Sequence, residues 1–301
     1  MKLKPDPSPL RWILLILLSL IWGSSFILIK KGLEHYGFIQ AATIRLMTAG
    51  LSLLPLAFFQ FKKIPGHKLK YVCLTGFFAM FLPAYLFCFA QQHIQSSVAG
   101  ILNALTPTWT LLIAIFWFKN KFAFLQIIGL VLGLASSFYL SMLSSRTGWS
   151  INAYALLVVL ATVCYGLNIN LVKNHLSVVS PIAVSVCSVV FAGLMAMLIF
   201  FLPNINSFRI APEHYSSLYA LMLLGLIGSA LAIIIHNYLI SISTPLFASA
   251  NTYFIPMVAI GWGVLAGEKL NFYHVIGMAG LMLSVGLIRK QKNATFKVSG
   301  E

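Results

Sequence analysis

Ten apolar stretches of about twenty residues fill almost the whole chain, and they constrain its fold more than any other feature. A helix needs about 20 apolar residues to cross the ~30 Å hydrocarbon core of a bilayer. The stretches cover residues 11–29, 38–60, 71–90, 97–118, 123–144, 152–172, 180–202, 217–238, 245–266 and 271–289. We therefore expect an all-α integral membrane protein with ten transmembrane helices.

The composition agrees with this fold and excludes several classes of protein. Only 8% of the 301 residues are charged and 60% are hydrophobic, whereas a soluble domain carries about 25% charged residues. So little charge cannot cover a water-exposed surface, which excludes a soluble enzyme, a disordered protein and a nucleic-acid binder. The four cysteines lie in apolar stretches without CxxC or Cys/His ligand spacing, so we expect neither a disulfide framework nor a metal site.

The first stretch resembles a signal peptide because Lys2, Lys4 and Arg11 precede it. However, the apolar run continues through Trp22 and Phe26 without a clean small-x-small cleavage site. We therefore interpret this stretch as a transmembrane helix.

The basic residues are distributed unevenly between the short loops. With the N-terminus inside, 14 of the 20 Lys and Arg residues lie in cytoplasmic segments, five lie in outer loops, and Arg45 lies within a span. Cytoplasmic loops are enriched in Lys and Arg, so we expect both termini in the cytoplasm and the protein in the cell membrane, or in the inner membrane of a cell with two. The net charge of +15 then reflects topology and binding to the anionic headgroups of the lipid bilayer, and we expect no nucleic-acid partner.

The two halves of the chain resemble each other. Residues 21–31 (IWGSSFILIKK) match residues 164–174 (CYGLNINLVKN) at an offset of 143, which also brings Gly50 onto Gly193. Further pairs occur in the same order at offsets of 148 or 149: Asn103 with Asn251, Pro107 with Pro256, and Gly129 with Gly277. Ordered matches at a near-constant offset indicate an internal duplication.

Each half contains five expected helices, so the two halves lie in the membrane with opposite orientations. We expect a first repeat in residues 1–145, a second in residues 151–290 and a cytoplasmic tail in residues 291–301. Inverted repeats are typical of secondary transporters, whose substrate site lies at the repeat interface near the membrane midplane.

An ordered set of residues resembles the EamA type of the drug/metabolite transporter superfamily. The set is Trp22-Gly-Ser-Ser-Phe26, Arg45, Pro107 and Leu265-Ala-Gly-Glu268. The resemblance covers nearly the whole chain and implies a ten-helix transporter that moves metabolites, amino acids or toxic compounds, often outward. One departure is clear: the carboxylate that the family has after the fourth span is Asn120 here, between Lys119 and Lys121.

Two charged residues near the outer side of the spans stand out, because such groups are costly in lipid and face the bundle interior. Arg45 lies about seven residues into the second stretch, roughly 10 Å from its outer end. It either binds an anionic or carboxylate-bearing substrate, or it has a structural role, snorkelling to the interface or pairing with a neighbour. Glu268 is the acid nearest in depth, and we expect Arg45 or Lys269 beside it.

Ten polar or aromatic residues within the spans form the candidate substrate-binding set. His236 either relays protons or contacts substrate, or it makes a hydrogen bond between helices as a neutral imidazole. The serines and asparagines have the same alternative, but several fall in repeat-related pairs, which favours a shared cavity. The set is Trp22, Ser24, Ser25, Arg45, Asn103, Tyr165, Asn168, His236, Asn237 and Asn251.

No HExxH, GxSxG or Walker motif supports an enzyme, and we expect no cofactor. We expect a small-molecule transporter acting as an exporter; the alternative is a non-transporting sensor or assembly protein, and the duplication favours transport. Gly129 and Gly133 form a small-xxx-small motif that suits packing against a helix or a second protomer in a homodimer. No Asp or Glu lies in the central part of any stretch, so we expect no strict sodium or proton dependence. Uniport, substrate exchange and proton coupling through His236 remain open.

Overall fold

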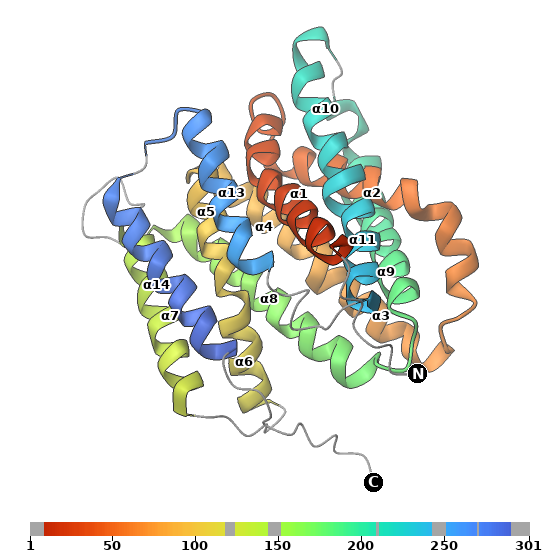
Figure 1. Ribbon diagram of the computed structural model, residues 1–301. Coiled ribbons are helices and arrows are strands. Elements are labelled where there is room, and N and C mark those ends of the chain that lie inside the picture. Colours follow the sequence, from red (N-terminus) through yellow and green to blue (C-terminus); the bar gives the residue numbers. More distant parts are fainter. Residues whose placement is uncertain are drawn as a thin grey trace.

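The computed structural model describes residues 9–117, 124–143, 152–208, 211–242, 251–269 and 271–289. These parts of the chain are helical, without a β-strand, and Figure 1 shows one bundle of helices. The α-helices are α1 (Leu10–Gly32), α2 (Phe38–Phe61), α3 (Leu69–Thr75), α4 (Leu82–Gln91), α5 (Ser96–Leu102), α6 (Thr106–Phe116), α7 (Phe124–Leu143), α8 (Ala153–His175), α9 (Pro181–Ala196), α10 (Tyr215–Leu223), α11 (Ala232–Ile242), α13 (Asn251–Leu265) and α14 (Phe272–Arg289).

Short irregular turns join several of these helices into longer rods. The π-helical segments Gly76–Phe81 and Leu224–Leu231 connect α3 to α4 and α10 to α11, and the 3₁₀ turn Asn103–Leu105 connects α5 to α6. A further π-helical segment, Met197–Phe201, and a 3₁₀ turn, Leu202–Ser207, extend α9. These irregular turns were not predicted from the sequence.

Within the described parts of the chain, seven rods are long and apolar enough to cross a membrane, which confirms a multi-pass membrane protein. They are Leu10–Gly32, Phe38–Phe61, Gly66–Gln91, Ser96–Phe116, Ala153–His175, Pro181–Ser207 and Pro212–His236. The other three expected stretches coincide with shorter apolar helices, Phe124–Leu140, Phe254–Leu265 and Phe272–Leu287. Asn120 and its flanking lysines, residues 145–151 between the halves, residues 245–250 of the ninth stretch and the tail 291–301 lie outside the described residues.

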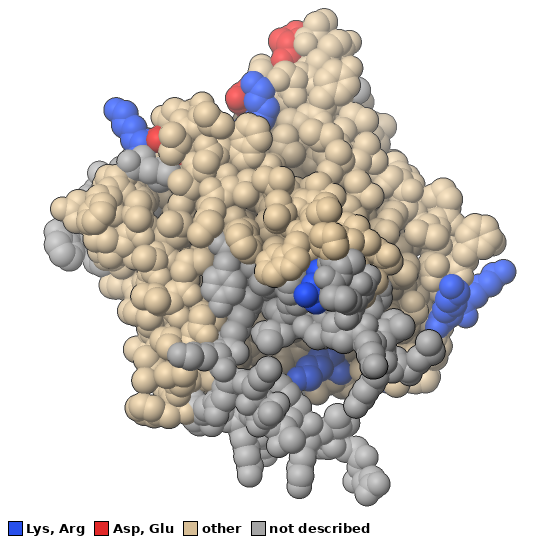
Figure 2. All heavy atoms as spheres, in the orientation of Figure 1, with Lys and Arg blue, Asp and Glu red and all other residues tan. Residues whose placement is uncertain are grey.

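Large apolar side chains cover the outside of the bundle. Phe58 and Trp117 are 68% and 74% exposed, and Phe116 and Phe272 are exposed to a similar degree. Water would penalise such a surface, whereas lipid chains would cover it. Figure 2 agrees: the described atoms of this face are mostly uncharged, and red acidic atoms appear only near its upper edge.

Pairs of helices approach closely where both carry small residues. α2 and α9 cross at Gly50 and Gly193, where a Cβ on Gly50 would lie 2.9 Å from the Cα of Gly193. α7 and α14 lie side by side (Figure 1), and the Ser284 hydroxyl donates a 2.6 Å hydrogen bond to the Gly129 carbonyl. The small-xxx-small motif at Gly129 therefore packs against a helix of the same chain.

The π-helical segments Gly76–Phe81 and Leu224–Leu231 each pack a glycine against the backbone of another helix. A Cβ on Gly225 would lie 2.6 Å from the Arg45 carbonyl oxygen of α2, and a Cβ on Gly76 would lie 2.6 Å from the Ser188 carbonyl oxygen of α9. Since any side chain would collide with these backbone atoms, glycine sets the distance at which both segments pack.

Candidate substrate site

Arg45 lies within α2 with its side chain partly buried against the second half of the chain. Its Nε donates a 3.2 Å hydrogen bond to the Ser229 hydroxyl, which comes from the π-helical segment of the α10–α11 rod. Cys88 of α4 and Tyr165 of α8 also lie near the guanidinium. Arg45 thus lies where rods from both halves meet.

No described carboxylate neutralises Arg45. Three acidic residues lie in the described ranges: Glu268 pairs with Lys30, Glu34 pairs with Lys31, and Glu213 is exposed. A guanidinium in a low-dielectric surrounding attracts an anionic group strongly. The arrangement can therefore bind a carboxylate or another anion in the bundle.

Glu268 pairs with Lys30. The expectation that Arg45 or Lys269 would be its cationic partner was therefore wrong. The Lys30 ammonium approaches the Glu268 carboxylate to 2.9 Å, and the Glu268 side chain is only 1% exposed. Gly267 adopts a left-handed conformation with φ of 75° and ends α13, so the chain reverses there. The N–H of Glu268 donates to the Gly263 carbonyl, which completes a C-terminal cap.

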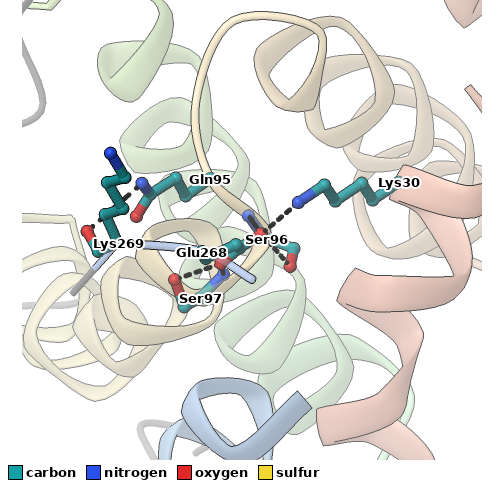
Figure 3. Close-up of polar contacts among 6 residues, drawn as sticks. All are labelled: Lys30, Gln95, Ser96, Ser97, Glu268 and Lys269. Carbon is teal, nitrogen blue, oxygen red and sulfur yellow. Dashed lines mark hydrogen bonds and ion pairs between the residues drawn. The ribbon is translucent and has the colours of Figure 1, made fainter. Parts of the chain in front are cut away.

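This reversal carries the Glu268 carboxylate from the end of α13 to the start of α5 (Figure 3). A carboxylate is unfavourable at a helix C-terminus but favourable at an N-terminus, where free N–H groups point outward. Burial raises the pKa of the Glu268 carboxyl, but hydrogen bonds from Ser96, Ser97 and Lys30 outweigh burial and lower the pKa to about 2.

Trp22 and His236, which both belong to the predicted substrate-binding set, lie in contact. Their ring centroids are 5.2 Å apart, and the Trp22 indole Nε1 donates a 3.1 Å hydrogen bond to the Gly228 carbonyl. Gly228 lies in the π-helical segment between α10 and α11. His236 and Trp22 therefore belong to one contact between α1 and the α10–α11 rod.

The two serines of α1 use their hydroxyls within the protein. Ser25 donates to the Ile21 carbonyl of its own helix, and Ser24 accepts a 2.7 Å hydrogen bond from the Trp262 indole. Ser25 is buried. The Ser25 O–H is thus engaged within its own helix, whereas the Ser24 oxygen acts as the acceptor in its bond to Trp262.

Asn103 and Asn168 each retain a buried side-chain oxygen without a hydrogen-bond partner. The indole nitrogen of Trp109 in α6 is also buried without a hydrogen-bond partner. Buried polar atoms usually have a partner, so these atoms are available to a ligand or to water. Asn251 is buried at the start of α13, and the side chain of Asn237 lies outside the described part.

A cavity of about 560 Å³ opens between α6 and α8. Its lining is apolar and is made by Trp109, Leu112, Ile113, Phe116, Trp117 and Val163. Of the residues with an unpaired buried polar atom named above, Trp109 lines this cavity. Arg45 does not line the cavity.

The structure thus divides the predicted set. It brings Arg45 near Tyr165, and Trp22 near His236, while Ser24 and Ser25 make structural hydrogen bonds. Sequence reasoning missed Ser229 and also the 2.9 Å hydrogen bond between Thr43 and Tyr85. Serine and threonine are common in transmembrane helices, so no sequence signal separated these residues from other helix contacts.

Comparisons with known proteins identify similar transporters. A model of the EamA-like transporter family matches residues 10–142 and 152–290. The uncharacterized inner membrane transporter YedA of Escherichia coli is 26% identical over 286 residues, which cover 91% of this chain and 89% of that protein.

Two other relatives have names that refer to amino acids. A probable terminal-alkyne amino-acid exporter of Streptantibioticus cattleyicolor is 23% identical and covers 89% of this chain and 91% of its own length. A probable amino-acid metabolite efflux pump of Salmonella typhimurium is 24% identical, covering 95% and 98%. A solved crystal structure with 13% identity superimposes with a TM-score of 0.61 over 92% of this chain and 95% of that chain, a likeness in fold alone.

Proposed function

The chain belongs to the EamA-like transporter family, and from this premise we propose that it exports small metabolites by alternating access between two inverted five-helix repeats. The proposed repeats are residues 1–145 and 151–290, followed by a cytoplasmic tail in residues 291–301, with both termini in the cytoplasm. In this proposal the protein has ten transmembrane helices, and three of them include the shorter apolar helices.

Contacts that occur twice support the repeats. The offset of 143 carries Arg45 onto Ser188, and an offset of 149 carries Gly76 onto Gly225. Gly225 packs on the Arg45 carbonyl, and Gly76 packs on the Ser188 carbonyl, so one contact is the copy of the other.

Two further contacts follow the same rule. Gly23 of α1 packs on Val258 of α13, and Gly166 of α8 packs on the backbone of Thr110 in α6. The offsets carry Gly23 onto Gly166 and Thr110 onto Val258. Gly50 and Gly193 correspond at the offset of 143 and also lie in contact. A pseudo-twofold axis that relates the two repeats would therefore pass between them.

The substrate proposed for this site carries a carboxylate or another anionic group. The observation that carries this proposal is Arg45, which no described acid neutralises and which lies near Tyr165 and Ser229. The amino-acid exporter and the amino-acid metabolite efflux pump among the relatives agree with a carboxylate-bearing substrate. Trp22, His236, Asn103, Asn168, Asn237 and Asn251 are proposed to line the remainder of the path.

Transport in proteoliposomes tests this function. Liposomes containing the purified protein would be loaded with a panel of radiolabelled amino acids, other carboxylates and neutral or cationic compounds. Release of each compound would be compared with its release from liposomes without the protein. We expect release of some carboxylate-bearing compounds and none of their amide analogues. Unchanged release across the panel, with unchanged metabolite profiles in cells lacking the protein, would favour the sensor or assembly role.

A further inference from the structure

Four lysines gather where α2 ends and α3 begins. Lys62 and Lys63 follow α2, whereas Lys68 precedes α3 and Lys70 lies in its first turn. Three of the side chains are exposed and that of Lys68 is half-buried. The ion pairs among the described residues use none of these lysines. We call Lys62, Lys63, Lys68 and Lys70 the basic corner.

The three described acids lie at the other end of the bundle. Glu34 precedes α2, whose 24 residues place it about 36 Å along the helix from Lys62. Glu213 precedes α10, whose start contacts the turn after α1, and Glu268 pairs with the end of α1. Figure 2 agrees, since the blue atoms at the right edge, where α2 ends, have no red atoms beside them. The basic corner therefore has no described carboxylate to neutralise it.

Tyr71 brings two of these lysines together with a histidine from the second half of the chain. The Tyr71 ring stacks on the ring of His175 with 4.2 Å between centroids and an interplanar angle of 4°. The Nζ atoms of Lys70 and Lys68 lie 5.1 Å and 5.9 Å from the Tyr71 centroid. His175 is the last residue of α8. An anionic group placed here would meet two ammonium groups and an imidazole, and lysine is a common ligand of phosphate.

An apolar surface adjoins the basic corner. Phe58, Phe59 and Phe61 at the end of α2 are 68%, 65% and 53% exposed. The Lys62 Nζ lies 5.4 Å from the centroid of the Phe58 ring, so this lysine runs along the apolar surface and carries its charge to the membrane interface. A molecule bound here would meet apolar side chains next to the ammonium groups. This combination suits a phospholipid, whereas a soluble phosphate compound would leave the phenylalanines uncovered.

We propose that the basic corner is a binding site for an acidic phospholipid. The lipid phosphate would lie beside Lys68, Lys70 and His175, and the acyl chains would cover Phe58 and Phe59. Charge complementarity carries this assignment, because basic pockets between transmembrane helices bind anionic headgroups. One headgroup would contact both α3 and α8, which belong to different halves of the chain. The inference does not depend on the transported substrate or on the direction of transport.

Native mass spectrometry of the full-length protein in detergent tests this site, because it resolves individual bound lipids. The probes are dioleoylphosphatidylglycerol and dioleoylphosphatidylcholine, which share their acyl chains and phosphate but differ in net charge. We expect the first phosphatidylglycerol to bind more tightly than the first phosphatidylcholine. The double variant Lys68→Gln, Lys70→Gln should weaken phosphatidylglycerol binding about 25-fold, since each lysine near an anionic headgroup contributes about fivefold.

Two further variants separate a defined site from general attraction to a basic protein. Lys31→Gln with Lys269→Gln removes two positive charges from the opposite end and should change the affinity less than about twofold. Tyr71→Leu keeps every charge but removes the ring beside both lysines, and it should weaken binding about two- to fivefold. Equal losses in the two double variants would overturn the proposal, as would equal affinity of the wild type for the two lipids.

A competition experiment distinguishes a lipid headgroup from a free phosphate. Inorganic phosphate and glycerol 3-phosphate, each added in excess over the lipid, should leave phosphatidylglycerol bound. Displacement by either would assign the basic corner to a soluble phosphate compound and overturn the lipid site. These measurements use no transported compound, so failure of the proposed export would leave their outcome unchanged, and failure of the lipid site would leave the proposed export untouched.

Discussion

Arg45 lies within α2, where Ser229 fixes its Nε and no described carboxylate pairs with it. A hydrogen bond to a charged group contributes about 1.5–3 kcal/mol, more than a bond between neutral groups. The charge of Arg45 and its orientation by Ser229 are separate properties, and different substitutions remove them one at a time.

Arg45→Gln should weaken the affinity for a carboxylate-bearing substrate by about 10- to 100-fold, which corresponds to the ~1.5–3 kcal/mol of a charged hydrogen bond. Ser229→Ala keeps the charge and should cost less, about threefold, because it frees the guanidinium to move. The concentration dependence of transport in proteoliposomes measures both. Equal losses for a carboxylate and for its neutral amide would contradict an anion-binding role.

Glu268 should make stability depend on pH in a defined window. Its folded pKa of about 2 lies below the usual 4.5, so the folded state favours the ionised carboxylate. The resulting stabilisation, about 3 kcal/mol, is complete above pH 4.5 and is lost as the pH falls toward 2.

Thermal unfolding in detergent from pH 7 to pH 3 measures this effect. The midpoint of the wild type should exceed that of Glu268→Gln by several degrees above about pH 5, and the two should converge below it. Glu34→Gln is the control, because the Lys31–Glu34 pair is nearly half exposed at both side chains and contributes about 0–1 kcal/mol. A constant gap between wild type and Glu268→Gln down to pH 3 would contradict the lowered pKa.

The sequence indicated Arg45 and Glu268 as unusual residues but not their partners. Lys30 and Glu268 are 238 residues apart, so only tertiary packing brings them together. Gly267 before Glu268 was the one local signal, because glycine after a helix allows the reversal that turns the carboxylate away from α13. For Ser25, the hydroxyl can bond its own helix, and this competition is invisible in a residue pattern.

At the scale of helices, the apolar pattern predicted the ends of regular helices well. The second expected stretch, 38–60, corresponds to α2 at Phe38–Phe61. The π-helical segments at Gly76–Phe81 and Leu224–Leu231 could not be predicted, because their composition is that of any apolar helix. In both segments the change from α-helical to π-helical hydrogen bonding occurs where a glycine packs against a carbonyl of another helix, and local helix propensity does not indicate it.

The α2–α9 crossing should tolerate no side chain. A Cβ on Gly193 would lie 2.7 Å from the Leu46 carbonyl oxygen and 2.8 Å from the Gly50 Cα, both backbone atoms. Gly193→Ala and Gly50→Ala should each destabilise the protein by about 1–3 kcal/mol, because the helices must separate.

Gly261→Ala is the matched control in α13, since beyond the backbone of its own helix turn and its two chain neighbours the added Cβ meets no described atom within 4 Å. Alanine favours a helix over glycine by about 1 kcal/mol, so this variant should be neutral or more stable. Thermal unfolding in detergent compares the three. Similar destabilisation at Gly261 and Gly193 would mean that close packing is not the cause.

At the scale of the whole molecule, the proposed arrangement of five helices in each half has a direct test. Reporter fusions after Ser145 and after Lys297 should report opposite sides of the membrane, with Lys297 inside. The same side for both would remove the odd number of spans in the first half, and with it the inverted repeat.

Ion coupling is also a property of the whole transporter. A sodium ion prefers anionic or dense oxygen ligands, and the described acids lie at or beyond the ends of helices. Transport should therefore persist in proteoliposomes when sodium and proton gradients are collapsed and a substrate gradient remains. His236→Gln should weaken substrate binding more than it changes the pH profile, because His236 packs against Trp22. Accumulation driven by a pH difference and lost in His236→Gln would contradict this prediction.

The meeting of Gly50 with Gly193 has a consequence for how such a molecule can diversify. In a homodimer of separate five-helix chains, a residue on the symmetry axis would contact the same residue of the partner. A single mutation would then change both residues of that contact. Joining the copies in one chain lets each side change alone. In the proposed repeats Arg45 and Ser188 occupy corresponding positions, yet one is a cation and the other a small alcohol. A fused chain can thus place one charge where a symmetric pair would place two, and so distinguish the head of a substrate from its tail.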